Sequence, residues 1–386
     1  MLLALAEQNK LDHFAYRADK LDIAAATVAE EIRRNYPTLD VPYHSRWRHF
    51  EVGGIDRWAQ LAPAIVDPTE RARARIDLAV VSVLLDAGAG AAWSYREAAT
   101  GQVHARSEGL AVASFAMFAA GAFSARAGRK LQADASGLQA FDQAALTQGF
   151  QVTTDNPLVG LAGRASLINA LGRALAARPD LFGANEPRTG RLTDHFQARA
   201  RGGALPASDV LAALLDGLSS IWPGRIELGG VNLGDVWRHP GIKTGDLTDG
   251  LVPFHKLSQW LAYSLLEPLE EAGIGIVDLD ALTGLPEYRN GGLLIDLGVL
   301  VPRDPGALDR VHRPADVFVV EWRALTVALL DRLAQGVRTK LGVTAASFPL
   351  ARVLQGGTWS AGRSIAAELR PGGAPPIRLD SDGTVF

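Results

Sequence analysis

The stretch 252–300 places ionisable and amide side chains inside an otherwise apolar sequence, and its residue types could do chemistry. A buried polar group without a partner costs about 2–7 kcal/mol, and an unpaired charge costs more. A chain that only had to fold would use fewer such groups here. The candidate residues of this stretch are His255, Lys256, Asp278, Asp280, Glu287, Tyr288, Arg289 and Asn290.

A helix is expected to begin near Pro253, because an apolar stripe recurs at helical spacing from Phe254 onward. His255 and Lys256 flank this stripe at the helix start. A cation and the free backbone N–H groups of a helix N-terminus together suit an anion such as phosphate. The alternative is a surface lysine that lies along apolar neighbours.

Carboxylates follow that helix. Asp278 and Asp280 are two residues apart, so they share a side of an extended backbone. Paired carboxylates raise one another's pKa, which suits acid or base work, although either could cap the next helix instead. Glu287 lies beside apolar sequence that would raise its pKa, but Arg289 could neutralise it in a structural ion pair.

A second cluster follows residue 41 and holds Tyr43, His44, Arg46 and Trp47. Aromatic rings between cations and imidazoles suit a pocket for a planar or sugar-like ligand. The same residues also suit a cation–π cluster that only anchors the N-terminal region.

Composition excludes several functions. The net charge of -3 favours neither nucleic acid nor an anionic membrane surface. The absence of Cys excludes thiolate metal sites and cysteine nucleophiles and fits a cytoplasmic protein. The N-terminus does not resemble a secretory signal, and no apolar run reaches the about 20 residues of a membrane span. No HExxH or Gly-x-Ser-x-Gly motif occurs, so no metal site and no serine hydrolase is expected.

Most long segments read as helix. We expect helices over 21–34, 71–88, 167–178, 208–218, 253–271 and 322–341. Strand signals are short and few, at 151–154, 275–279 and 317–320. The sequence therefore predicts a mostly α fold with a few short strands, built as one large helical domain over 1–386. If that domain is subdivided, we expect helical subdomains 1–125 and 126–386, with a seam near 183–203.

Several longer motifs carry a family resemblance. The blocks LLDAGAGAAWSYRE, VPYHSRWRHFE, VPFHKLSQWL, LTGLPEYRNGGLLIDLGVL and LQGGTWSAGR resemble the uracil catabolism protein 4 family, whose domain has no assigned activity. A more distant block order, Phe254, Lys256, Gln259 and then Glu287-Tyr-Arg, is similar to queuosine 5′-phosphate N-glycosylases, which have Asp where this chain has Glu287. That similarity implies a DNA-glycosylase-like helical fold.

These resemblances imply a role in uracil degradation through a ribosylated intermediate. The leading hypothesis is an N-ribosyl hydrolase that acts on a ribosylurea-like, 5′-phosphorylated small molecule without a cofactor. Glu287 would stabilise charge at the sugar, with Asp278 or Asp280 assisting. Lys256 and Arg289 would hold the phosphate, and the cluster from Tyr43 onward would cover sugar or urea.

Two other classes stay open. A metal-assisted amidohydrolase that opens a ureido bond would use His44, His49, His239 or His255 as ligands. A non-catalytic nucleotide-binding protein of the pathway would bind its ligand without turnover. The sequence does not indicate the oligomeric state.

Overall fold

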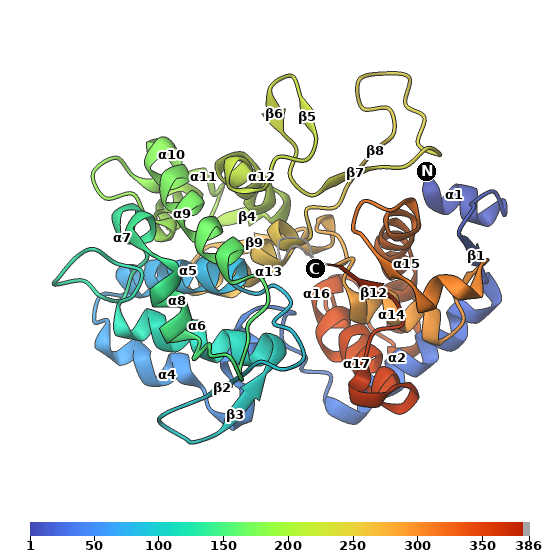
Figure 1. Cartoon of the computed structure of the whole chain (residues 1–386), viewed down its shortest axis with the longest axis horizontal. Helices are drawn as coiled ribbons and strands as arrows, with labels where there is room; N and C mark the ends of the chain where they lie inside the picture. Colours follow the sequence, from blue (N-terminus) through green and yellow to red (C-terminus); the bar gives the residue numbers. More distant parts are fainter. Residues whose placement is uncertain (381–386) are drawn as a thin grey trace. The chain divides into compact units, whose positions relative to one another are not determined.

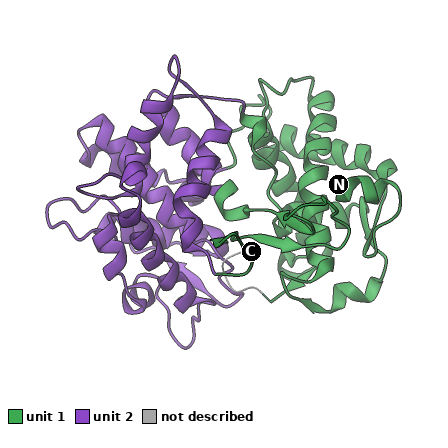
Figure 2. Cartoon of the chain, turned by 90° about the horizontal axis from the view of Figure 1, so that it is seen from above, with its two compact units in different colours: residues 1–44, 224–259, 279–381 green, residues 45–223, 260–278, 382–386 purple. Residues whose placement is uncertain are grey.

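Helices dominate the computed structural model, which describes residues 1–380 (Figure 1). The predicted mostly α fold with short strands is therefore confirmed. The described chain divides into two compact units, each assembled from separate stretches (Figure 2). Among the described residues, unit 1 holds Met1–His44, Gly224–Gln259 and 279–380, and unit 2 holds Ser45–Pro223 and Trp260–Asp278. Residues 183–203 lie within unit 2, and the single domain with its 1–125 and 126–386 subdomains stays a prediction.

Unit 1 is built around long helices from both ends of the chain. Its α-helices are α1 (Leu2–Glu7), α2 (Leu21–Asn35), α14 (Tyr288–Asp296), α15 (Val317–Leu341), α16 (Leu350–Val353) and α17 (Trp359–Leu369). A π-helical turn, Leu354–Thr358, joins α16 to α17. Its strands are β1 (Phe14–Tyr16), β5 (Glu227–Leu228), β6 (Val231–Asn232), β7 (Val236–Arg238), β8 (Leu251–Pro253), β10 (Leu300–Pro302), β11 (Val311–His312) and β12 (Arg378–Leu379).

The core of unit 1 forms where α2 lies along α15. Val28 and Ile32 of α2 and Leu333 of α15 are completely buried. The two backbones approach closely at Gly336, where an added Cβ would lie 2.9 Å from the Cβ of Ala25. Small residues at this crossing let the apolar faces of both helices close over one core.

Unit 2 is also helical. It contains α3 (Trp47–Phe50), α4 (Arg57–Leu61), α5 (Pro68–Leu84), α6 (Arg106–Ala120), α7 (Ala135–Ala140), α8 (Gln143–Gly149), α9 (Leu161–Ala177), α10 (Pro179–Phe182), α11 (Leu192–Arg199) and α12 (Ala207–Leu218). Its strands are β2 (Ser94–Arg96), β3 (Val103–Ala105), β4 (Ala204–Pro206) and β9 (Gly275–Val277). Helix α13 (Lys256–Glu271) gives Lys256–Gln259 to unit 1 and its remaining residues to unit 2.

Helix α5 forms the centre of unit 2, because every residue from Ala74 to Leu84 is buried. A helix that is covered on all sides belongs to the core of a domain. Helices α6 and α9 pack against it, and α7 and α8 pack against α9.

The strands contribute little to the core. Every ladder among residues 1–380 joins two strands: β1–β10, β2–β3, β5–β6 and β7–β8 are antiparallel, and β4–β9 and β11–β12 are parallel. In the β7–β8 ladder, Val236 pairs with Pro253 and Arg238 with Leu251. This pairing brings the residues before β7 next to the start of α13.

The predicted helices are confirmed, although α5, α9 and α15 begin earlier than expected and α5 ends at Leu84. The predicted helix start at Pro253 is wrong, because Pro253 ends strand β8 and α13 begins at Lys256. The predicted strand at 275–279 is confirmed as β9, over a shorter range. The predicted strand at 317–320 is wrong, since these residues form the first turn of α15. Val319 and Val320 are completely buried there, and tertiary burial outweighs the β-propensity of a valine-rich run.

The predicted strand at 151–154 is also wrong. Gln151 has a left-handed backbone (φ 54°), and residues 151–154 lie in a loop. Its side-chain amide accepts a hydrogen bond from the N–H of Arg96 at 3.0 Å and donates one to the carbonyl of Arg96 at 2.8 Å. A side chain thus pairs with the β2 edge where a partner strand would otherwise lie.

Over residues 1–380, we find no helix that combines the length and the apolar character needed to cross a lipid bilayer.

Candidate functional site

The start of α13 is fixed by Asp235, which lies just before β7 in unit 1. Its two carboxylate oxygens accept a bidentate pair of hydrogen bonds from Arg323, both at 2.8 Å. The Trp237 indole donates at 2.6 Å, and the backbone N–H of Lys256 donates at 3.0 Å. Burial alone would raise the pKa of Asp235, but the Arg323 charge and these donors outweigh it and lower that pKa to about 2. Asp235 is therefore an ionised cap at the first residue of α13.

His255 sits immediately before that residue in a strained conformation, with a φ of 48°. A non-glycine residue in this region costs about 1–3 kcal/mol, and such strain often occurs at functional sites. Burial lowers the pKa of the half-buried His255 imidazole, and the nearby Arg323 charge adds to this effect while Asp235 opposes it. The ring is thus neutral at neutral pH and can accept or donate a hydrogen bond.

Glu287 is the buried acid of the site, with 7% of its surface exposed. It caps the N-terminus of α14 by accepting hydrogen bonds from the backbone N–H of Arg289 at 2.8 Å and of Asn290 at 2.6 Å. Burial raises the pKa of Glu287, while these two bonds and the charges of Lys256 and Arg289 partly offset the rise. The carboxyl group is thus a stronger base than a free glutamate, with a lysine close enough to influence its charge.

The loop before Glu287 is tied to α13. The side-chain oxygen of Gln259 accepts a hydrogen bond from the N–H of Thr283 at 3.3 Å. Lys256 and Tyr288 are half-buried, so both combine contact with the protein and exposure to solvent. Two helix starts, each capped by a buried carboxylate, therefore place Lys256 and Glu287 in one neighbourhood of unit 1.

The side chains of Arg289 and Asn290 bond mainly to other protein groups. Arg289 donates to the carbonyl of Gly373 at 2.8 Å, and its guanidinium lies 4.9 Å from the Tyr288 ring centre. Asn290 is completely buried, donates to the carbonyl of Leu285 at 3.1 Å and accepts from the Thr358 hydroxyl at 2.8 Å. Of the two side chains, only that of Arg289 is charged, and its charge lowers the pKa of Glu287.

Helix α14 can take this position because its glycines allow close packing. A Cβ on Gly291 would lie 2.6 Å from the Trp322 ring, whose N–H donates to the Gly291 carbonyl at 3.0 Å. The backbone at Gly291 therefore lies directly against a side chain of α15.

The π-helical turn supplies partners that sequence reasoning missed. Thr358 holds Asn290, and the Gln355 side-chain oxygen lies 2.9 Å from Nδ1 of His44. With that oxygen as the acceptor, His44 carries its proton on Nδ1. Tyr43 lies beside the Arg352 guanidinium, 5.8 Å from ring centre to Cζ. π-Helical turns are frequent at functional sites.

Arg46 and Trp47 belong to unit 2, whereas Tyr43 and His44 belong to unit 1. Trp47 is buried beneath the Arg75 guanidinium, 3.9 Å from its ring centre, and its N–H donates to the Ser264 carbonyl at 2.9 Å. These are the contacts of an anchoring cation–π cluster, the alternative interpretation of this segment. Arg46 is completely buried in a polar network described below.

The carboxylates Asp278 and Asp280 are exposed. Asp278 has a φ of 54° and lies in unit 2. Asp280 lies in unit 1, where it pairs with Arg338 at 2.6 Å and accepts a hydrogen bond from the N–H of Leu350 at 2.6 Å. Asp280 thus binds the backbone at the start of the distant α16, whereas the α-helix that follows this pair in the sequence, α14, is capped by Glu287.

Asp235 and Arg323 were not among the predicted site residues. Asp235 lies in the segment 222–240, which carries no phosphate-binding motif. Arg323 lies 88 positions further along the chain, so no local spacing connects the two. The one local signal was an isolated acid before the Val-Trp-Arg of β7.

The histidines proposed as metal ligands are separately engaged. His44 contacts Gln355, His239 contacts Glu321 at 3.2 Å, and His49 lies 3.1 Å from Arg46. Across residues 1–380, His, Asp and Glu side chains form no group of three or more that could hold a metal ion.

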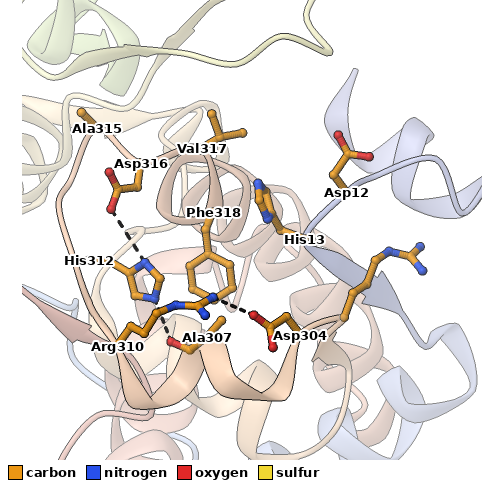
Figure 3. A pocket seen from close by; sticks show the side chains of 11 residues that line it. Asp12, His13, Asp304, Ala307, Arg310, His312, Ala315, Asp316, Val317 and Phe318 are labelled. Carbon is orange, nitrogen blue, oxygen red and sulfur yellow. Dashed lines mark hydrogen bonds and ion pairs between the residues drawn. The ribbon is translucent and has the colours of Figure 1, made fainter.

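A pocket of about 750 Å³ lies elsewhere in unit 1, at the start of α15 (Figure 3). His312 stacks on Phe318 at 4.5 Å, and His13 meets the same ring edge-on at 5.8 Å. Arg310 at its rim pairs with Asp304 at 2.7 Å. Because other protein rings already cover the Phe318 ring, and most of the charged side chains around the pocket are paired, we do not place the candidate site in this pocket.

With this geometry established, comparison with known proteins gives the class. Residues 1–386 match the family described as "Protein of unknown function (DUF1688)", and the chain belongs to that family.

Two relatives extend over almost its full length. "Uracil catabolism protein 4" from Lachancea kluyveri is 41% identical over 417 residues, covering 98% of this chain and 94% of the relative. "Protein urg3" from Schizosaccharomyces pombe is 41% identical over 397 residues, covering 100% and 95%. The more distant similarity to queuosine 5′-phosphate N-glycosylases, and the DNA-glycosylase-like fold it implies, stay predictions.

Proposed function

We propose that this protein acts in uracil catabolism as an N-ribosyl hydrolase that cleaves the C1′–N bond of a ribosylurea-like, 5′-phosphorylated compound. The name of the Lachancea kluyveri relative, uracil catabolism protein 4, supports the pathway. The observation that carries the chemistry is Glu287, a buried carboxyl group with a raised pKa beside Lys256.

Cleavage of a C1′–N bond builds positive charge on the sugar ring. A buried carboxylate stabilises that charge and takes a proton from the attacking water. The water oxygen bonds to C1′, the C1′–N bonding pair leaves with the urea nitrogen, and the proton passes to that nitrogen. The raised pKa of Glu287 suits this base. The reaction needs no cofactor.

Lys256 is the proposed phosphate contact, because it is the half-buried first residue of α13. Arg289 adds a positive charge nearby. His255 and Tyr288 are the proposed contacts to sugar or urea, since both are half-buried beside this position.

The remaining predicted site residues support the proposal less directly. Asn290 acts by holding α14 in place, and its side chain bonds to protein groups. Tyr43, His44, Arg46 and Trp47 stay proposed ligand contacts, as do Asp278 and Asp280 in an assisting role. Asp278→Asn and Asp280→Asn, assayed beside Glu287→Gln, test that role.

The experiment mixes purified protein with ribosylurea 5-phosphate and measures free urea and reducing sugar. Glu287→Gln should lower kcat by about 10²–10³, the usual effect of removing one oriented charge-stabilising group. Near-normal turnover in this variant would remove Glu287 from the mechanism.

The control must separate catalysis from helix capping, because Glu287 does both. Asp142→Asn makes the same carboxylate-to-amide change at the cap of α8, where Asp142 accepts from the N–H of Ala145 at 2.7 Å. Both variants should lose about 0.5–2 kcal/mol of stability. Only Glu287→Gln should lose turnover.

The same assay distinguishes the two other classes. Loss of activity in chelator, with recovery on adding zinc or manganese, would favour a metal-assisted amidohydrolase. Measurable ligand binding without product would favour a non-catalytic nucleotide-binding protein. A cytoplasmic location and a small-molecule ligand in place of nucleic acid stay part of the proposal.

A further inference from the structure

Asp86 in unit 2 is held by two buried arginines. It lies in the loop 85–88 that follows α5. Arg46 is completely buried, and its Nη1 lies 2.8 Å from a carboxylate oxygen of Asp86. Arg164 is 2% exposed and donates to the carbonyls of Leu85 at 3.2 Å, Ala87 at 2.9 Å and Gly88 at 3.1 Å. One guanidinium fixes the carboxylate, and the other fixes the backbone on both sides of it.

This arrangement is energetically expensive. Burial lowers the pKa of Arg164 to about 10, although the Asp86 charge opposes the shift. Burial also lowers the pKa of Arg46, and Asp86 again opposes it. A turn that only had to end a helix would use a glycine or asparagine cap. Two buried cations around one loop instead indicate a carboxylate whose position matters.

A hydroxyl completes the cluster. Ser107 lies in the first turn of α6 and donates to both carboxylate oxygens of Asp86, at 2.6 and 2.7 Å. The preceding residue, Arg106, has a strained φ of 55° at the β3–α6 corner. Nη1 of Arg46 also donates to the Ser107 hydroxyl at 3.1 Å. Strain and hydrogen bonds together fix the Ser107 side chain against Asp86.

The cluster retains unused hydrogen-bonding capacity. Nη2 of Arg46 is buried and has no hydrogen-bond partner among the residues that the structure describes. The Asp86 side chain is 12% exposed, and Ser107 is half-buried. An ionised carboxylate oxygen has two acceptor positions, so the exposed part of Asp86 can accept further bonds.

A second buried Asp–Arg pair in the same unit shows what such a pair looks like when it serves only the fold. Asp77 is completely buried and pairs with Arg188. It also accepts from the Thr189 hydroxyl at 2.7 Å and the N–H of Gly190 at 2.6 Å. Asp77 has no surface that a ligand could reach, whereas Asp86 does.

We propose that Asp86, together with Ser107, binds the vicinal hydroxyl groups of a pentose. The ligand must donate hydrogen bonds to a carboxylate, which excludes an anionic group at this point. The two arginine charges disfavour a cationic ligand. A neutral diol donates to the carboxylate and to the remaining acceptor lone pair of the Ser107 hydroxyl, whose own proton is bound by Asp86. The diol is inferred from the hydrogen-bonding groups of the cluster, whereas the choice of a pentose rests on the ribosylated substrate of the proposed function.

The test compares two probes that differ by one hydroxyl group. Isothermal titration of the full chain with ribose 5-phosphate and with 2-deoxyribose 5-phosphate should show about 10- to 100-fold tighter binding of the ribose compound, the range for one hydrogen bond to a charged group. In Asp86→Asn this ratio should fall toward one. Ser107→Ala, which leaves the Arg46–Asp86 pair intact, should reduce the ratio to a smaller extent.

Asp77→Asn is the matched control, because it removes a carboxylate from a comparable buried pair. Asp77→Asn should lower the free energy of unfolding but leave the ratio of the two affinities unchanged. Asp142→Asn at the cap of α8 should also leave the ratio unchanged, and because the measurement is of binding, a loss of turnover in Glu287→Gln would not bear on it. Equal affinity of the two probes for the unmodified protein, no measurable binding of either, or an unchanged ratio in Asp86→Asn would each overturn the inference.

Discussion

The Asp235–Arg323 pair should decide both the stability of unit 1 and the geometry at the start of α13. The perturbation is Asp235→Asn. The pKa of Asp235 falls from 3.8 to about 2 on folding, which corresponds to about 2 kcal/mol of stability at neutral pH. The variant also leaves the completely buried Arg323 without its charge partner, and breaking such a pair typically costs about 3–5 kcal/mol. We expect a loss of about 3–5 kcal/mol.

The loss should depend on pH in a defined direction. A carboxyl group with a depressed pKa stabilises the fold above its unfolded pKa and loses that contribution as pH falls through the folded pKa. The difference between the unmodified protein and Asp235→Asn should therefore be constant from pH 7 to 5. It should shrink from about pH 4 toward pH 2.

Urea unfolding followed by circular dichroism and tryptophan fluorescence measures this difference. The double variant Asp235→Leu/Arg323→Met replaces the pair with apolar groups and should be less destabilised than either single variant. A loss below about 1 kcal/mol in Asp235→Asn, or a difference that does not change down to pH 2, would refute the reasoning.

Two further predictions concern the same helix start. Lys256→Met should move the acid limb of the pH profile of kcat/KM to higher pH, because the Lys256 charge lowers the pKa of Glu287. Lys243→Met, at an exposed lysine, is the control and should leave the limb in place. An unmoved limb in Lys256→Met would place Lys256 away from Glu287. His255→Gly should raise stability by up to about 1 kcal/mol by relieving the strain at φ 48°, whereas His255→Ala should not. Both variants remove the imidazole ring and should lower turnover equally if that ring contacts substrate. Unfolding assays on the two variants measure the backbone strain, and activity assays measure the role of the ring.

The sequence by itself determined the helical character of the chain and the neighbourhood of the candidate site. The 3.6-residue apolar pattern located α2, α5, α9, α12, α13 and α15, because each helix buries one face or its whole surface. Lys256 and Glu287 stood out because polar groups inside apolar sequence need a reason to be buried. Local patterns failed at Val317–Val320, where burial made a valine-rich run helical.

Only the tertiary structure decided the partners of these residues. Arg323 meets Asp235 across 88 positions, and Gln355 meets His44 across 311, so no periodicity or motif in either segment signals the contact. The same holds for Arg46, just before α3, and Arg164 of α9, which converge on Asp86 from distant parts of the chain. Hydrophobic periodicity is a property of one segment, whereas a buried charge is stabilised by whichever distant segment folds against it. For that reason the sequence could nominate chemical groups, and the fold determined which of them are capped, strained or left with hydrogen-bonding capacity to spare.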